Sequence, residues 1–177
     1  MPKEFLVLLV AVIIVMVWCY KHLTWRSKMT KKPKRLTVPE GKLIVYKKAR
    51  CIKKKDYFSF KNFDKNFEMW FNSRDVLVKL EVPESAHAIR SAGDGYGGVN
   101  SDQKCRASKA KVLDITYLNG RPVDLKKNTV YSNHDYEFIY KRDKIVKPKK
   151  KFDSRDIVCA SGIHFFMTKT RAKKYCL

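Results

Sequence analysis

Paired cysteines and glycosylation acceptors are missing from this sequence. Its five cysteines are an odd number, and no two of them form a C-x-x-C pair. Small secreted domains usually carry an even and denser set of cysteines, which they join as disulfides. The chain also has no Asn-x-Ser/Thr acceptor for N-glycosylation. Both absences favour a domain that faces a reducing compartment.

Acidic residues are scarce. The chain has 17 Asp and Glu against 39 Lys and Arg, a formal net charge of +22. Such an excess says little about the fold but predicts acidic partners, such as anionic lipid, nucleic acid or acidic proteins. Hydrophobic residues make up 45% of the chain, which excludes a disordered tail.

One long stretch lacks any charge, proline or glycine. It runs from Phe5 to Tyr20, and we expect a single transmembrane helix over residues 5–23. Trp18 and Tyr20 suit the membrane interface, and Lys21 can extend its ammonium group to the headgroups. Sixteen apolar residues span roughly 24 Å, which fits a thin, endoplasmic-reticulum-like bilayer best. A cleaved signal peptide and a buried core helix are the alternatives.

The flanking charges predict an orientation and a domain plan. Residues 1–4 form a short tail, and a polybasic linker at 24–38 follows the apolar segment. The positive-inside rule therefore places the following domain, residues 39–177, in the cytosol. We expect a single-pass protein of an intracellular membrane, with a short tail on the other side.

Alternating and β-branched residues predict the fold of the domain. They indicate strands at 42–48, 75–82, 111–118, 129–132, 136–141 and 162–166, with turns at 118–122 and 141–144. A short helical segment is expected between residues 62 and 73, and a C-terminal helix capped by Thr168. The predicted class is α+β, with a mostly antiparallel sheet behind the membrane helix.

Three stretches carry a resemblance to a known family. They are "LIVYKKAR" (43–50), a stretch from "VLVKLEVPE" to "QKCRASKAKVLDI" (76–115), and a stretch from "YEFIYK" to "CASGIHFFMTKTRAKKY" (136–175). They resemble a domain of unknown function found in nucleocytoplasmic large DNA viruses and some of their hosts, often beside pentapeptide repeats, which this chain lacks. The resemblance implies a viral setting, at a virion or an assembly membrane. It implies no established enzymatic activity.

Cysteine and histidine residues are the candidates for chemistry. A thiol nucleophile would combine Cys159 with His164, or with His134 and Asp135. A zinc site would need four ligands, and no closely spaced pair supports one. The set would be Cys105, Cys159, His164 and Cys176. We expect no catalytic site, no metal and no cofactor, with Cys105 and Cys159 as buried apolar residues.

Lysine clusters are the candidate binding surface. They lie at 47–55, 141–151 and 169–174, and the residues singled out are Lys53, Lys54, Lys55, Lys147, Lys149, Lys150 and Lys151. We expect a structural or interaction module that contacts anionic lipid headgroups, viral structural proteins or host factors. A membrane-tethered antagonist of a host factor is an alternative. Nucleic acid is a less favoured partner, because no recognition motif accompanies the lysines.

Overall fold

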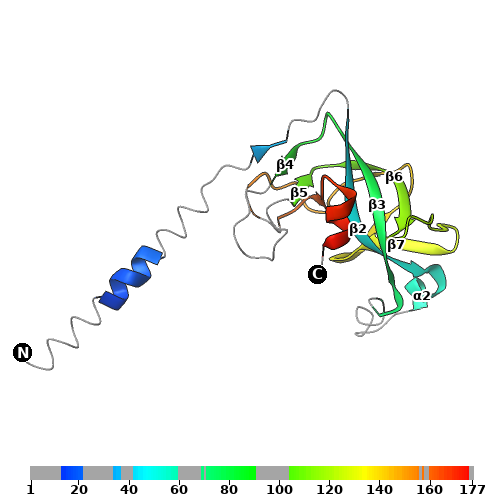
Figure 1. The fold of residues 1–177 in the computed structure, drawn as a ribbon, viewed down its shortest axis with the longest axis horizontal. Helices are drawn as coiled ribbons and strands as arrows, with labels where there is room; N and C mark the ends of the chain where they lie inside the picture. The colour runs from blue at the N-terminus through cyan, green and yellow to red at the C-terminus, as the bar shows by residue number, and fades with distance from the viewer. Residues whose placement is uncertain are drawn as a thin grey trace, which may run out of the picture. The chain divides into compact units, whose positions relative to one another are not determined.

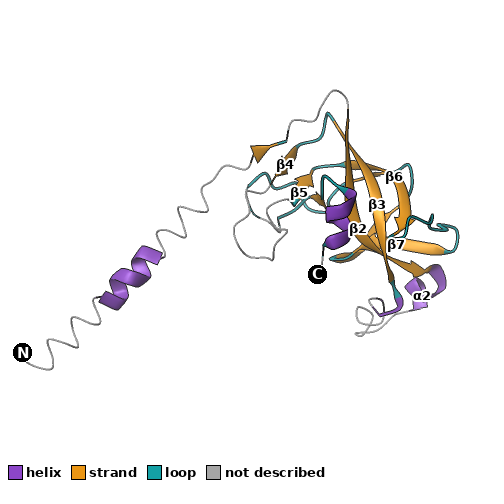
Figure 2. Cartoon of the chain, in the orientation of Figure 1, coloured by secondary structure: helices purple, strands orange, loops and turns teal. Residues whose placement is uncertain are grey.

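The computed structural model describes residues 13–21, 34–36, 42–59, 69, 71–90, 104–155, 157 and 160–175. The chain divides into two compact units, Met1–Lys32 and Pro33–Leu177. The second unit is built mostly of antiparallel β-strands, with short helices (Figures 1 and 2). The antiparallel sheet and the C-terminal helix are as predicted, but strands dominate the domain more than the α+β class implies.

The first unit contains a helix at residues 13–21. Its large apolar side chains, from Ile13 to Val17 with Trp18 and Tyr20, are all at least 50% exposed. Among the described residues, no helix is both long enough and apolar enough to cross a membrane. The remaining residues of the expected span, Phe5 included, lie outside the described part of the chain.

A curled six-stranded antiparallel sheet forms the larger part of the domain. Its order is β8-β7-β2-β3-β6-β9. The strands are β2 (Lys42–Lys53), β3 (Arg74–Pro83), β6 (Ala110–Tyr117), β7 (Asn128–Ser132), β8 (Asp135–Tyr140) and β9 (Ile145–Val146). The register shifts at Lys79/Leu80 and at Tyr131/Ser132. Such irregularities increase local twist, which helps a sheet to curl.

The central pair of strands explains why the sheet forms. β2 and β3 pair from Lys42↔Pro83 to Cys51↔Arg74. Valine and other apolar residues recur at every second position, and those on one face are buried. On β2 this inward face carries Val45, Lys47, Ala49 and Cys51. A lysine therefore occupies a core-facing position.

A second sheet of four strands completes the core. Its order is β1-β4-β5-β10, and its strands are β1 (Lys34–Arg35), β4 (Ala88–Arg90), β5 (Cys105–Ala107) and β10 (Ile163–Phe165). Ala88, Cys105 and Phe165 belong to the same buried apolar cluster as the valines of β2 and β3. The two sheets thus share one core. β1 falls in the range expected as a linker, yet it belongs to this sheet.

Two short helices whose full extent is described flank the sheets. α2 (Lys54–Ser59) follows β2, and α4 (Lys169–Lys174) lies against β2 and β3 (Figure 1). The Thr168 hydroxyl accepts a hydrogen bond from the Arg171 backbone N–H, which confirms the predicted N-cap. Ala172 and Tyr175 pack with Leu77 and Phe166, so the helix covers the outer face of β3.

Most of the predicted strands are confirmed, with β2 extending five residues beyond its expected end. The structure adds β1, β4, β5, β9 and α2, which the sequence did not reveal. Each of these four strands is only two or three residues long, too short to show alternation. Much of the helical segment expected between residues 62 and 73 lies outside the described residues.

Candidate anion-binding site

A cavity of about 540 Å³ opens between β2, β7, β8 and the start of β10. Six basic side chains line it: Lys47, Lys104, His134, Lys149, Lys150 and His164. The other lining residues are Ser132, Asp135, Phe138, Tyr140, Pro148, Ala160, Ser161, Gly162 and Ile163. One wall is therefore apolar and aromatic, and much of the remainder is cationic. We call this space the basic cavity.

Lys47 on β2 is a lysine whose side chain is buried at the cavity. It is only 8% exposed, because its strand position points into the core between Val45 and Ala49. Within the described residues, its ammonium group has no hydrogen-bond or ion-pair partner. Burial, reinforced by the charge of Lys104, lowers the pKa of Lys47 from 10.5 to about 8. An ammonium group in this position is costly unless something compensates it.

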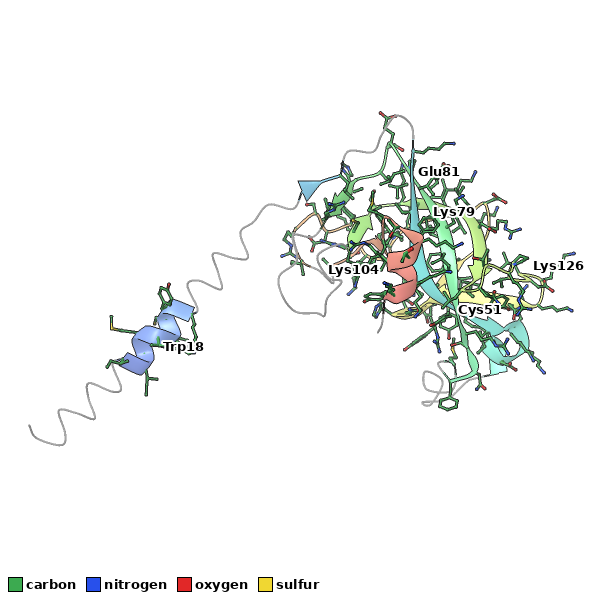
Figure 3. The ribbon with its side chains drawn as sticks, viewed as in Figure 1. Trp18, Cys51, Lys79, Glu81, Lys104 and Lys126 are labelled. Atoms are coloured by element: carbon green, nitrogen blue, oxygen red, sulfur yellow. The ribbon has the colours of Figure 1, made fainter. Side chains whose placement is uncertain are left out.

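Lys104 precedes β5 and lies beside α4 (Figure 3). It is 7% exposed, and its ammonium group donates to the Tyr175 hydroxyl at 3.3 Å. The same group lies 5.2 Å from the centre of the Tyr175 ring, a cation–π contact. None of the described carboxylates forms an ion pair with Lys104 or Lys47. The cavity therefore contains two buried cations that have no counter-charge among the described side chains.

Lys149 differs from Lys47 and Lys104 because it has carboxylate partners. Lys149 donates to Asp135 at 3.2 Å and to Glu137 at 2.7 Å, so its charge is largely compensated. These hydrogen bonds, Glu137 first, raise the pKa of Lys149 and keep it protonated. Asp135 is the one carboxylate that lines the described cavity, and it is already occupied by this lysine. The net field inside the cavity is positive.

His134 and Tyr140 supply neutral polar groups. Burial of the ring, with the charges of Lys47 and Lys104, lowers the pKa of His134, so the ring is neutral near pH 7. Burial raises the pKa of Tyr140, and its hydroxyl forms a side-chain hydrogen bond with Ser132. His164, half-buried on β10, faces the same space. Neutral imidazoles can donate to an anion or accept its proton.

A buried arginine holds one wall of the cavity. Arg106 on β5 is 0% exposed, and its guanidinium donates to the carbonyl oxygens of Asp153, at 2.9 Å, and of Arg155. Gly162 lies against it, since a Cβ atom there would be 3.1 Å from the Arg106 Cβ. Arg106 therefore holds Asp153, Arg155 and Gly162 in place, and Gly162 lines the cavity on that side.

The structure describes two residues of the candidate zinc site, Cys105 and His164. Cys105 is fully buried, as expected, and pairs with Phe165 in the sheet, whereas His164 pairs with Arg106. Neighbouring positions on a strand point to opposite faces, so Cys105 and His164 do not face one another. Burial raises the pKa of the Cys105 thiol, which disfavours the thiolate that binds metal. Cys159 and Cys176 lie outside the described residues.

The candidate partners of a thiol nucleophile lie together in the structure. His134, Asp135 and His164 all line the basic cavity, although they come from distant parts of the chain. Their proposed nucleophile, Cys159, lies outside the described residues. The described part of the chain contains no group of three or more His, Cys, Asp or Glu side chains placed to hold a metal ion.

The lysine clusters divide between two places. Lys149 and Lys150 line the basic cavity, and Lys147 and Lys151 are exposed beside them in the sequence. Lys53, Lys54 and Lys55 are exposed at the end of β2 and the start of α2, and they do not line the cavity. Lys47 was counted with the surface cluster at 47–55, but its side chain is buried.

The two buried lysines were the residues that sequence reasoning missed. The sequence did contain a sign that Lys47 is buried, because Lys47 shares the odd-numbered positions of β2 with three buried apolar residues. Lys104 had no such signal, since it lies just before a strand of only three residues. The three stretches that carry the family resemblance contribute Lys47, Lys104 and His164, which meet at this cavity.

A small, basic, mostly antiparallel β domain with a cationic cavity is the class that the fold and site define. Residues 34–172 match a family of unknown function (DUF5758), and the chain belongs to that family. No curated protein and no solved structure matches the chain.

Proposed function

We propose that this chain is an interaction module whose β domain binds a negatively charged group in the basic cavity. One observation carries the proposal: Lys47 and Lys104 are buried, line an open cavity and have no carboxylate partner among the described residues. A buried cation normally has a hydrogen-bonded counter-charge. A bound anion would supply the compensation that the described side chains do not.

Membrane attachment belongs to the same proposal. The helix at 13–21 exposes its apolar side chains, and the sequence around it extends this apolar character to residue 5. Exposed apolar surface of this kind suits a lipid environment. We propose a single span over 5–23 with the β domain on the cytosolic side, at an endoplasmic-reticulum-like membrane.

A viral setting also remains a proposal. It rests on the resemblance of three stretches of the sequence to a domain of large DNA viruses. It also rests on an amino-acid composition rich in Lys, Phe and Tyr, which is similar to that of small membrane proteins of African swine fever virus. In such a setting the module would act at the virion or assembly membrane. Its partners would be anionic lipid headgroups or other structural proteins of the virus.

Anion binding can be tested by thermal unfolding of the full chain in a neutral detergent. Inorganic phosphate and sulfate are compared with chloride at constant ionic strength, because a ligand that binds only the folded state raises the midpoint. We expect phosphate to raise the midpoint in the natural protein and not in the double variant Lys47→Met/Lys104→Met. The control, Lys126→Met, alters an exposed lysine that projects from a turn away from the cavity (Figure 3).

Equal midpoints in phosphate, sulfate and chloride would contradict anion binding. The orientation is tested separately by protease treatment of sealed microsomes that contain the newly made chain. Digestion of the β domain is expected if it faces the cytosol, and full protection would overturn the orientation.

A further inference from the structure

We propose that the ligand of the basic cavity is a phosphomonoester with an apolar, preferably aromatic, body. Its phosphate would lie between Lys47 and Lys104, and its body would lie against Phe138, Tyr140 and Ile163. This inference rests on the proposed function, since it specifies the ligand class of the same cavity. The shared chemistry could come from a free phosphorylated metabolite or from a phosphorylated lipid headgroup.

The charge of the cavity favours a dianion. Two buried ammonium groups lack a carboxylate partner within the described residues, and the adjacent Asp135 is engaged by Lys149. A carboxylate or a phosphodiester carries one negative charge and would compensate only one of the two lysines. A phosphomonoester loses its second proton near pH 6, so it carries close to two charges at neutral pH.

The donor groups also suit a phosphate. Lysine binds phosphate as a point charge, with three N–H donors that can be shared among its oxygens. His134, whose pKa is lowered by burial, lines the same space and can add a neutral donor, and His164 lines it as well. A tetrahedral group can reach donors that come from several directions, and here they come from β2, from the residue before β5, from the β7–β8 turn and from β10.

The size and the walls argue for a body beyond the phosphate. Cavities of about 300–1,000 Å³ typically hold drug-sized ligands, and this one measures about 540 Å³. Inorganic phosphate alone would leave most of it filled with water. Phe138 and Tyr140 project from the same strand, with their ring centres 5.3 Å apart, and Pro148 and Ile163 extend this apolar wall. Aromatic rings pack well against such a surface.

The test measures binding to the full chain in neutral detergent by titration calorimetry. The probes are phenyl phosphate, its methyl diester (methyl phenyl phosphate) and inorganic phosphate, all at pH 7. We expect phenyl phosphate to bind at least tenfold more tightly than either of the other two. Lys47→Met and Lys104→Met should each weaken it at least tenfold, whereas Lys126→Met should change its affinity less than twofold.

A further variant separates the head of the ligand from its body. Phe138→Ala should weaken the binding of phenyl phosphate severalfold and leave the affinity for inorganic phosphate within twofold.

Two more probes distinguish the possible sources of the ligand. Adenosine monophosphate represents a soluble ligand, and a short-chain phosphatidylinositol 4-phosphate represents a lipid headgroup. Tighter binding of either one supports the phosphomonoester class and identifies its source.

Three results would overturn the inference. If inorganic phosphate binds as tightly as phenyl phosphate, the apolar body is wrong while anion binding stands. If the methyl diester binds as tightly as the monoester, the dianion argument fails, and a phosphodiester, as in a nucleic-acid backbone, becomes the better ligand. If no probe binds to the natural protein or to any variant, both this inference and the proposed function fail.

Discussion

The backbones of Tyr46 and Phe166, 120 positions apart in the sequence, exchange two hydrogen bonds. The Tyr46 N–H donates to the Phe166 carbonyl at 2.9 Å, and the Phe166 N–H donates to the Tyr46 carbonyl at 2.7 Å. This isolated bridge joins the end of β10 to the middle of β2. It places Lys47 and His164, each one or two residues from the bridge, at one cavity.

The first prediction concerns the stability cost of Lys47. Replacing it by Met, which has a similar length and no charge, should stabilise the unliganded protein at pH 7 by about 1–3 kcal/mol. The reason is that the buried ammonium group is disfavoured, as its lowered pKa of about 8 indicates. Denaturant unfolding in neutral detergent measures the change.

The pH dependence of that difference provides a second check. Because the pKa of Lys47 falls from 10.5 to about 8 on folding, the unfolded chain binds more protons between these values. The stability contributed by this group therefore rises with pH across that window. The advantage of Lys47→Met should be constant below about pH 8 and shrink towards pH 10.5. Lys79→Met, on the exposed side of β3, should show no such trend. A difference that is independent of pH would contradict the burial argument.

The sequence reveals the long strands because each is stabilised along its own length. In β3, valine and leucine occupy the positions that the core needs, and the alternation is visible without knowledge of the partner strand. Short strands such as β5 and β10 depend on their neighbours instead. Cys105 and Phe165 are buried because β4, β5 and β10 meet, a relationship that spans the chain.

The candidate site was predictable only in part, for a similar reason. Counting charges located the lysine clusters, but it could not tell a buried lysine from an exposed one. Lys47 and Lys53 belong to the same cluster, yet one is 8% exposed and the other lies at the surface. His134 and His164 were named as candidates for their chemistry, and the fold brings both to the cavity. Their association with Lys104 needed the tertiary structure.

The second group of predictions concerns the wall held by Arg106. Its guanidinium donates to the carbonyl oxygens of Asp153 and Arg155 from a fully buried position. Arg106→Met would leave these carbonyls without their donor, so we expect a loss of about 2–4 kcal/mol of stability. Hydrogen exchange should accelerate at residues 150–155 and 160–163 before it does so in β2 and β3.

A matched control is Arg142→Met. Arg142 pairs with Asp114 at 2.9 Å, and both side chains are nearly half exposed. Exposed pairs of this kind contribute about 0–1 kcal/mol. An equal loss of stability in the two variants, or unchanged exchange at residues 150–155 and 160–163 in Arg106→Met, would show that Arg106 does not hold this wall.

Asp75 gives a prediction at acidic pH. Its carboxylate pairs with Lys48 and Arg50, each at 2.8 Å, on the face of β2 opposite Lys47. Burial opposes ionisation, but the hydrogen bonds from Lys48 and Arg50 outweigh it, so the pKa of Asp75 is lowered. A lowered carboxyl pKa adds stability above its unfolded value of 3.8, and this is lost as the pH falls through the folded pKa.

Asp75→Asn should therefore lower stability by about 1–3 kcal/mol at pH 7 and by progressively less below pH 4. Unfolding midpoints of the two proteins between pH 2 and pH 7 measure this. The same comparison for Asp114→Asn, whose pair with Arg142 is exposed, should show a change below about 1 kcal/mol. A gap for Asp75→Asn that stays constant down to pH 2 would mean that the ion pairs do not stabilise the fold.

The last prediction is the pH profile of phosphomonoester binding. Above pH 8 the ammonium group of Lys47 loses its proton in the unliganded protein, so the affinity should fall as the pH rises. Below about pH 6 the ligand itself becomes a monoanion, so the affinity should fall there as well. His134, whose pKa is lowered, stays neutral across the middle of this range. We therefore expect a plateau in the affinity between about pH 6 and pH 8, measured with phenyl phosphate by calorimetry.

Lys47→Arg, which keeps its charge at every accessible pH, should extend the plateau to higher pH, because guanidinium does not deprotonate in this range. If the alkaline limb persists unchanged in Lys47→Arg, another group controls binding, and Lys47 is not in contact with the phosphate.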